Sequence, residues 1–224
     1  MNALSDLGIL RILQLSSSAL PVGGYSFSQG LEFAIEERWL KNSSDIRDWI
    51  AIVLVHAIAK TDLPLLIRLV EAFKTHDFKG VRYWNLHVLA CRETLELREA
   101  EIATGKALVK LLKGLKVCQG IAPKESLTFV AAYALAVSFW KIDVRAACHG
   151  FVWSWMENQV AAATKLLPLG QSAAQCILDD LIGMIPSAVS ASQSASDVEI
   201  GSSLPGLAMA SALHETQYTR LFRS

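Results

Sequence analysis

The chain has 224 residues, with 21 basic and 21 acidic side chains that give a formal net charge of zero. A balanced charge of this kind gives no indication of nucleic-acid binding. Hydrophobic residues make up 52% of the sequence and the mean hydropathy is +0.34, so we expect a substantial core and some apolar surface that partners cover.

Neither a membrane span nor an export signal is predicted. The longest uncharged apolar run in the middle of the chain is Ser126–Trp140, with 15 residues, which is shorter than the ~20 residues that a bilayer requires. The N-terminus lacks a basic stretch before an apolar one. We expect a cytoplasmic protein with reduced thiols. The four cysteines are Cys91, Cys118, Cys148 and Cys176.

Apolar spacing and cap residues predict four helices in the first third of the chain. The tetrapeptide Thr61-Asp62-Leu63-Pro64 supplies a cap residue and then a proline, which predicts that a new helix starts there. The four predicted helices cover Leu7–Leu15, Ser28–Trp39, Asp45–Lys60 and the residues from Leu63 to about Thr75.

A glycine-rich turn lies between the first two helices, over Ala19–Glu32, with the sequence ALPVGGYSFSQGLE. Its proline fixes φ, and Gly23-Gly24 allows positive φ, so the chain must turn here. The segment is either a tight connection whose aromatic side chains fill the core, or a rigid loop that presents Tyr25, Ser26 and Gln29 to a partner.

The middle of the chain has a heptad series of apolar residues, which predicts one long helix over Lys79–Lys113 that could break at Gly105. The series consists of Val81, Val88, Leu95, Ile102 and Val109. Further helices are predicted over Ser126–Phe139, from Asp143 to Leu166, and up to about Ile185.

No segment alternates convincingly with period two, so the predicted fold class is all-α, a single-domain bundle of about 8–10 helices. Residues 1–185 form its expected core. Residues 186–205, of which seven are serine, are expected to be a linker or mobile loop. Residues 206–224 regain aromatic and apolar side chains and are expected to form a C-terminal tail that docks on a partner.

Two polar segments each have two interpretations. In Arg92–Glu101 the spacing predicts ion pairs of Arg92 with Glu96 and of Arg98 with Glu101. This segment is either a solvated helix face or, since Arg98 falls near the apolar seam, part of a buried network. The amides and the lysine of Glu157–Gln175 either fix helix register in the core or belong to an interface.

The motifs of common enzymes are absent from the sequence: it contains no Walker loop, no GxGxxG and no GxSxG. The segment His214–Tyr218, HETQY, begins like the zinc motif HExxH but has a tyrosine in place of the second histidine. A helical metal-diphosphate enzyme of the terpenoid type is an alternative, but Asp179-Asp180 lacks the third carboxylate of DDxxD. An unrelated helical interaction protein is another. We expect no catalytic residue, no metal site and no cofactor.

Four segments occur in the order LPVGGYSFSQGLE, CRETLELRE, ENQVAAATKLLPLGQSAAQ and HETQYTRLFRS. These segments, which lie between positions 20 and 224, resemble segments of the urease accessory protein F (UreF) family. They occur in that family's order and near its usual separations. The order Tyr25-Ser26-Phe27 is a small departure, because the family often has the two aromatic residues exchanged.

The resemblance implies an all-α protein without catalysis of its own, active in GTP-dependent nickel insertion into apo-urease. The implied partners are the urease accessory protein D, also called H, the accessory GTPase G and apo-urease. A homodimer formed through helices within the complex is also implied, with no nucleic-acid or membrane partner. The protein would recruit or regulate the GTPase.

Placing this function on residues gives two hypotheses. The tail is expected to become ordered on the D-type partner, with aromatic and arginine anchors, through Tyr218, Arg220, Leu221, Phe222, Arg223 and Ser224. A second set is expected to frame the surface that meets the GTPase or lines the metal route: Gly23, Gly24, Tyr25 and Gln29 of the glycine loop, with Glu93, Arg98 and Lys165.

Overall fold

Polar side chains at helix starts set most of the helix boundaries. Each accepts a backbone N–H group from the first turn of the helix that follows, a donor that a helix end otherwise leaves unpaired. The residues that act in this way include Ser5, Asn42, Asp77, Thr94, Thr128 and Asp143.

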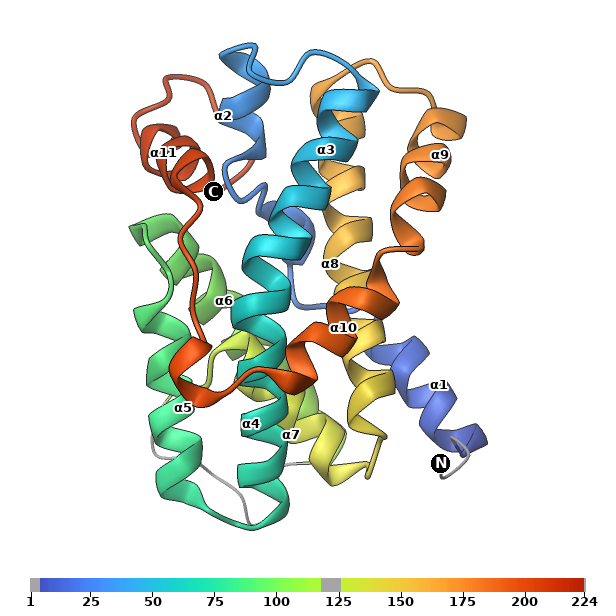
Figure 1. The fold of residues 1–224 in the computed structure, drawn as a ribbon, viewed down its shortest axis with the longest axis vertical. Coiled ribbons are helices and arrows are strands. Elements are labelled where there is room, and N and C mark those ends of the chain that lie inside the picture. The colour runs from blue at the N-terminus through green and yellow to red at the C-terminus, as the bar shows by residue number, and fades with distance from the viewer. Residues whose placement is uncertain (1–4, 118–125, 224) are drawn as a thin grey trace.

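The computed structural model describes residues 5–117 and 126–223, and within these ranges the chain forms helices and no β-strand (Figure 1). This confirms the predicted all-α fold. The α-helices are α1 (Asp6–Leu15), α2 (Leu31–Glu36), α3 (Ser43–Val53), α4 (Leu63–Lys74), α5 (Phe78–Ala90), α6 (Leu95–Gly114), α7 (Phe129–Phe139), α8 (Val144–Leu166), α9 (Gln171–Ile182), α10 (Ile185–Ser194) and α11 (Pro205–His214). Shorter segments are the 3-10 turns η1 (Gly24–Ser26) and η3 (Asp197–Glu199) and the π-helical segment η2 (Leu54–Asp62).

One continuous helical run, Ser43–Lys74, passes through the centre of the bundle (Figure 1). The predicted new start at Thr61–Pro64 is wrong, because the π-helical segment η2 joins α3 to α4 without a break. By length and composition the run could cross a membrane, but 61% of its most apolar window is buried inside the protein. It packs against α7, α8 and α10, as the core helix of a bundle does.

The predicted long helix over Lys79–Lys113 is two helices, α5 and α6, and the break lies after Ala90 rather than at Gly105. Thr94 caps the new helix and sets its start. Gly105 lies inside α6, where an added Cβ would come within 2.3 Å of the carbonyl oxygen of Leu127. The glycine therefore allows the start of α7 to approach α6 closely.

The serine-rich residues 186–205 differ from the expected linker or mobile loop, because they contain most of α10 and the turn η3. α10 has a proline in its first turn and buries Ala188, Val189 and Ser192. Three of its serine hydroxyls donate to backbone carbonyls three residues earlier, so the serines are accommodated in a helix. Composition alone did not reveal the buried face.

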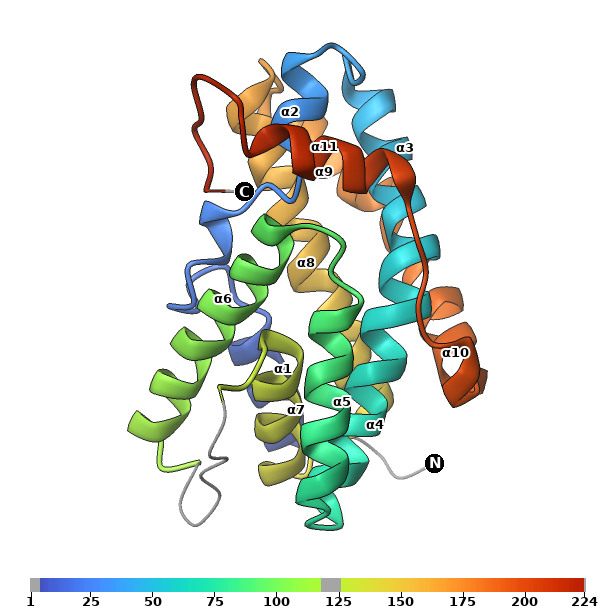
Figure 2. The same ribbon diagram turned by 90° about the vertical axis from the view of Figure 1, so that its left-hand side faces the viewer.

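An extended segment leads from η3 along η2 to α11 (Figure 2). Gly201 donates its N–H to the carbonyl of Lys60, and the hydroxyls of Ser202 and Thr61 lie 3.1 Å apart. α11 then packs on α2 and α6, which brings the end of the chain beside the glycine-rich turn near its beginning (Figures 1 and 2).

Candidate functional site

The glycine loop presents an aromatic side chain at the surface. Gly23 has φ +73°, as predicted, and begins the short turn η1. The turn directs Tyr25 outward, so that 63% of this residue is exposed. Gln29 points inward instead, and its Oε1 accepts the indole N–H of Trp155 at 2.9 Å. Tyr25 is therefore exposed, as the second interpretation predicts, whereas Gln29, which was also expected to face a partner, anchors the loop to α8.

The terminal segment, Glu215–Arg223, lies against the protein's own chain. The carboxylate of Glu32 accepts the backbone N–H groups of Leu221 at 2.6 Å and Phe222 at 2.9 Å. The N–H of Arg223 donates to the carbonyl of Ser26 in the glycine loop at 2.8 Å. Intramolecular contacts therefore order the segment that was expected to become ordered on a partner.

Lys165 joins the terminal segment to the glycine loop. Its Nζ lies 5.8 Å from the ring centre of Tyr25 and 5.5 Å from that of Phe222, within the range of cation–π attraction. We call this surface the composite face. It consists of Tyr25, Ser26, Lys165, Phe222 and Arg223.

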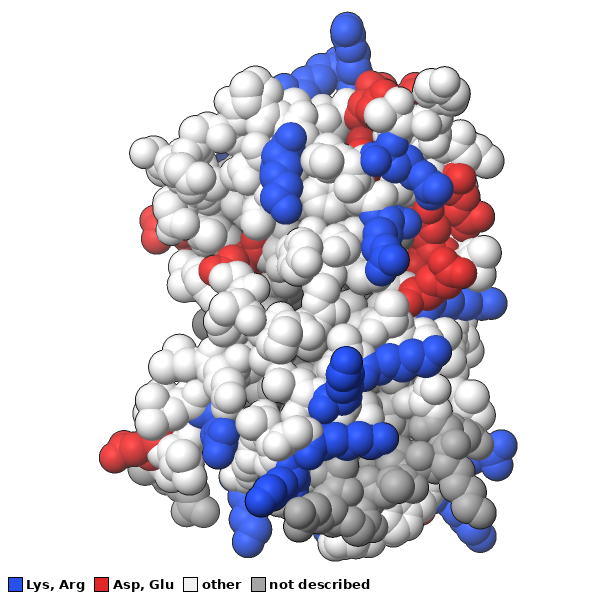
Figure 3. All heavy atoms as spheres, turned by 180° about the vertical axis from the view of Figure 1, so that it is seen from behind, with Lys and Arg blue, Asp and Glu red and all other residues white. Residues whose placement is uncertain are grey.

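Charge is unevenly distributed on the surface in spite of the zero net charge. On the side of the molecule opposite to the view of Figure 1, basic side chains predominate over the lower half, whereas acidic ones gather at one edge of the upper half (Figure 3). The protein therefore offers separate basic and acidic areas to partners.

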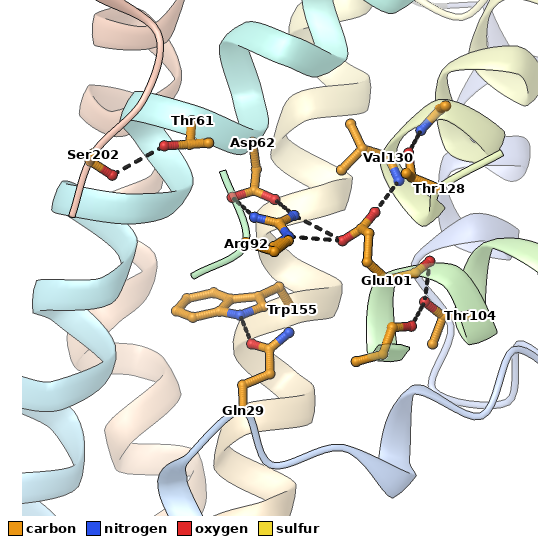
Figure 4. Close-up of polar contacts among 12 residues, drawn as sticks. Gln29, Thr61, Asp62, Arg92, Glu101, Thr104, Thr128, Val130, Trp155 and Ser202 are labelled. Carbon is orange, nitrogen blue, oxygen red and sulfur yellow. Dashed lines mark hydrogen bonds and ion pairs between the residues drawn. The ribbon is translucent and has the colours of Figure 1, made fainter. Parts of the chain in front are cut away.

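A cavity of about 150 Å³ extends from the glycine loop into the bundle. At its wall, Arg92 contacts Asp62 and also Glu101, whose Oε2 lies 2.8 Å from the guanidinium (Figure 4). Burial alone would lower the pKa of Arg92, but the two carboxylates outweigh it and raise that pKa above its ordinary value. The other oxygen of Glu101 accepts the N–H of Val130 at the start of α7, so this ion-pair cluster connects η2, α6, α7 and the segment between α5 and α6.

A second buried cluster lies beneath the terminal segment. His214 is fully buried, with Nδ1 2.8 Å from Glu96 and Nε2 3.0 Å from Glu32. Arg220 contacts the other oxygen of Glu96 at 2.9 Å. Burial raises the pKa of Glu96, although the hydrogen bond from His214 and the charge of Arg220 oppose it.

Several predicted site residues come together. Gly24, Tyr25, Gln29 and Glu93 all line the cavity. Glu93 also accepts the hydroxyl of Ser203 at 2.7 Å. In the segment Glu157–Gln175, Gln159 is buried and donates to Gln29, as the core interpretation predicts, whereas Lys165 is exposed.

Other predictions for single residues differ from the structure. Arg98 is exposed and its Nε donates to the carbonyl of Arg92. The predicted pair of Arg92 with Glu96 does not form, because Arg92 lies before the start of α6, and Glu96 contacts Arg220 instead. The predicted pair of Arg98 with Glu101 does not form either, because Glu101 contacts Arg92. Tyr218 projects fully into solvent. Ser224 lies outside the described residues.

Sequence motifs did not reveal the buried ionic clusters, although the sequence carries a signal for some of their residues. Asp62 is the one acidic residue in a long apolar stretch of Ser43–Lys74 that runs from Ala51 to Val70. His214 was considered only as half of a zinc motif. Glu32 was given no role in its predicted helix, and Glu96 was expected to pair with Arg92.

Comparison with known proteins supports one family. The sequence model of the UreF family matches residues 40–182. The chain is 46% identical over 220 residues to the urease accessory protein UreF of Marinomonas sp. (strain MWYL1), an alignment that covers 98% of this chain and 96% of the relative. It is 44% identical over 220 residues to the urease accessory protein UreF of Hahella chejuensis (strain KCTC 2396), covering 97% and 99%.

These matches extend over nearly the whole chain. The relatives are accessory proteins and not catalysts, so the terpenoid-type alternative is set aside. The chain belongs to the UreF family of urease accessory proteins.

Proposed function

We propose that this protein is a cytoplasmic, non-catalytic scaffold in urease maturation. It binds the D/H-type accessory protein, forms a homodimer within that complex, and recruits or regulates the accessory GTPase G for GTP-dependent nickel insertion into apo-urease. Membership of the UreF family supports a role in urease maturation. We place the contacts with the partner proteins on the composite face.

The observation that carries this placement is the meeting of two distant segments around Lys165. On the composite face Tyr25 is 63% exposed and Lys165 and Arg223 are exposed, whereas Phe222 is buried. Exposed aromatic and arginine side chains on a surface held by buried hydrogen bonds are the residues that commonly dominate protein interfaces. They cost little entropy on binding because the backbone beneath them is already fixed.

The test is co-elution of the purified chain with the D-type partner, followed by light scattering to give the mass of the complex. A truncation after Thr216 removes most of the terminal segment and keeps α11, which buries Ala210, Ser211 and His214 in the bundle. A truncation after Pro205 would also remove the packing of α11. A loss of partner binding could then result from misfolding rather than from the loss of a docking contact.

Point variants separate the face from the rest of the surface. We expect Tyr25→Ala and Lys165→Ala to weaken binding of the partner, or of the GTPase to the preformed complex, by about tenfold or more. Tyr83→Ala is the matched control, since Tyr83 is 58% exposed on α5, outside the composite face. Equal binding by all three variants would place the interface elsewhere, and a full chain that binds neither protein would contradict the proposed function itself.

A further inference from the structure

Lysines gather on the outer face of the second half of α6. Lys106, Lys110 and Lys113 are exposed, and at about 100° per residue they lie within about 60° of one another around the helix axis. Lys116, just beyond the end of the helix, is exposed as well. We call these four residues the lysine stripe. The second half of α6 runs through the lower half of the molecule (Figure 2), where basic side chains predominate (Figure 3).

The stripe has no counter-charge among the described residues. None of its four lysines forms an ion pair with any side chain in residues 5–117 or 126–223. The acidic residues of α6 lie in its first half, at Glu96, Glu99 and Glu101. A solvated helix gains stability when glutamate and lysine stand four residues apart, whereas Lys106 and Lys110 are like charges at this spacing and repel each other.

The helix dipole explains only part of the stripe. A positive side chain is favourable beside the unpaired carbonyl groups of the last turn, and this accounts for Lys113 and Lys116. Lys106 lies about two turns before Gly114, the last residue of α6, where the dipole has little effect. Repulsion within the stripe therefore stays uncompensated in the free chain, as expected of a surface whose counter-charge comes from another molecule.

The composition of the stripe favours a protein over a nucleic acid. Arginine, which binds phosphate in a bidentate manner, and aromatic residues, which stack on bases, are both absent from the sequence between residues 102 and 117. A polyanion longer than the stripe would also meet the acidic area in the upper half of the same side of the molecule (Figure 3).

A membrane surface fits the stripe no better. Peripheral membrane binding requires large apolar side chains beside the basic ones. The exposed neighbours of the lysines on α6 are instead Ala103 and Gly114, and the larger Leu115 is only 39% exposed.

An acidic protein face matches both the length and the relief of the stripe. From Lys106 to Lys113 the helix extends for about 10 Å, which is the length over which two turns of a partner helix present their side chains. An added Cβ on Gly114 would meet nothing within 4 Å, so the surface beside the lysines is open. The lysines therefore project from a low surface that a row of carboxylates can approach.

We propose that the lysine stripe is a second docking surface of this protein, and that it binds an acidic face of another protein of urease maturation. The inference rests on the proposed function for its three candidates, the D-type accessory protein, the GTPase and apo-urease. The terminal segment that bears part of the composite face lies in the upper half of the molecule (Figure 2). The two surfaces are therefore separate and can bind two partners at once.

The test measures binding of the three proteins to the immobilised full-length chain, each alone and after the D-type protein has bound, in 50 and 500 mM NaCl. Lys110→Glu reverses the central charge of the stripe, and an acid there can pair with Lys106 and Lys113, so the helix stays stable. We expect this variant to lower the affinity for one of the three proteins by about tenfold in 50 mM NaCl. In 500 mM NaCl the loss should be less than about twofold, because salt screens exposed charges.

Lys79→Glu is the matched control. It makes the same charge change in the exposed first turn of α5, outside the stripe, and should bind all three proteins as the wild type does. Thermal unfolding shows that both variants are folded. If the wild type and Lys110→Glu bind the three proteins equally, the inference is overturned and the proposed function stands. A wild-type chain that binds none of the three contradicts the proposed function, and the assignment of the stripe with it.

Two further probes separate a protein partner from other anions. A short DNA duplex and vesicles that contain phosphatidylserine are added to the wild type and to Lys110→Glu under the same salt conditions. We expect neither probe to bind in a way that Lys110→Glu weakens. If one of them does so while the three proteins do not, the stripe binds a nucleic acid or a membrane surface, and the inference of a protein partner is overturned.

Discussion

The carboxylate of Glu32, in the first turn of α2, accepts the backbone N–H of Phe222, 190 residues later in the chain. This contact fixes the end of the chain beside the glycine loop, to which Glu32 is directly joined. Two segments that look independent in the sequence therefore form one surface. A change in either of them is expected to affect the other.

Replacing Glu32 with alanine is expected to lower the free energy of unfolding by roughly 3 kcal/mol, because two N–H groups and the buried His214 lose their acceptor. Trypsin should also cleave after Arg220 much faster in this variant. Urea denaturation and a proteolysis time course measure the two effects. Glu37→Ala, an exposed position at the end of α2, should stay within about 0.5 kcal/mol of the wild type. If Glu32→Ala and Glu37→Ala lost similar stability and were cleaved at similar rates, Glu32 would not be the residue that holds the terminal segment.

Replacing Arg92 with methionine is expected to cost roughly 3–5 kcal/mol, because Asp62 and Glu101 are left buried without a counter-charge. Urea denaturation measures the loss. Arg47 also faces two carboxylates, Asp48 and Asp180, but at the surface, so Arg47→Met should cost no more than about 1 kcal/mol.

A triple variant separates the charge from the packing around Arg92. Asp62→Asn, Arg92→Met and Glu101→Gln together remove every charge of the cluster, so we expect the triple variant to regain much of the stability that Arg92→Met loses. If the triple variant is less stable than the single one, the loss arises from packing and hydrogen bonds rather than from unpaired charge.

Local patterns allowed most of the fold to be predicted. Cap residues such as Asn42 and Asp143, together with apolar spacing, are local signals in the sequence. The π-helical junction at Thr61–Pro64 could not be predicted in this way. Pro64 has no N–H to offer to the carbonyl of Lys60, and this carbonyl accepts instead from Gly201, far along the chain. A distant residue thus allows the helix to continue where the local sequence predicts a start.

The candidate site was predicted only in part, for a similar reason. Tyr25, Lys165 and Phe222 could be chosen singly from their segments, but their meeting depends on how α11 lies on α2. The role of His214 depends on Glu96 and Glu32, which are 118 and 182 residues away in the sequence. No local sequence pattern predicts contacts between residues that are so far apart in the chain.

Gly30 is expected to be essential for the position of α11. Its φ of +83° disfavours any other residue, and an added Cβ would lie 2.9 Å from the backbone nitrogen of Ser211. Gly30→Ala should therefore cost roughly 2–3 kcal/mol, about 1–2 from the backbone conformation and the rest from displacement of α11. Thermal unfolding measures the effect. Gly183→Ala is the control: Gly183 has φ −62° and open space around it, so alanine there should be neutral or stabilise by up to about 1 kcal/mol.

The cysteines are expected to differ strongly in reactivity. Burial raises the pKa of Cys148 to about 12, and the charge of Asp143 adds to this effect. At pH 8 only about one thiol in 10⁴ is then ionised, and only the thiolate reacts with alkylating reagents. Cys176 is exposed and should be alkylated within minutes, while Cys148 stays unmodified until the chain unfolds.

Iodoacetamide labelling of the native chain, followed by peptide mass mapping, distinguishes the two thiols, and labelling in urea provides the control in which both react. The rate at Cys148 should rise by about tenfold per pH unit below its pKa, because each unit increases the thiolate fraction by that factor. Rapid modification of Cys148 at pH 8 in the native chain would show that α7 and α8 separate readily, which would contradict the tightly packed core around Tyr133 and Phe151.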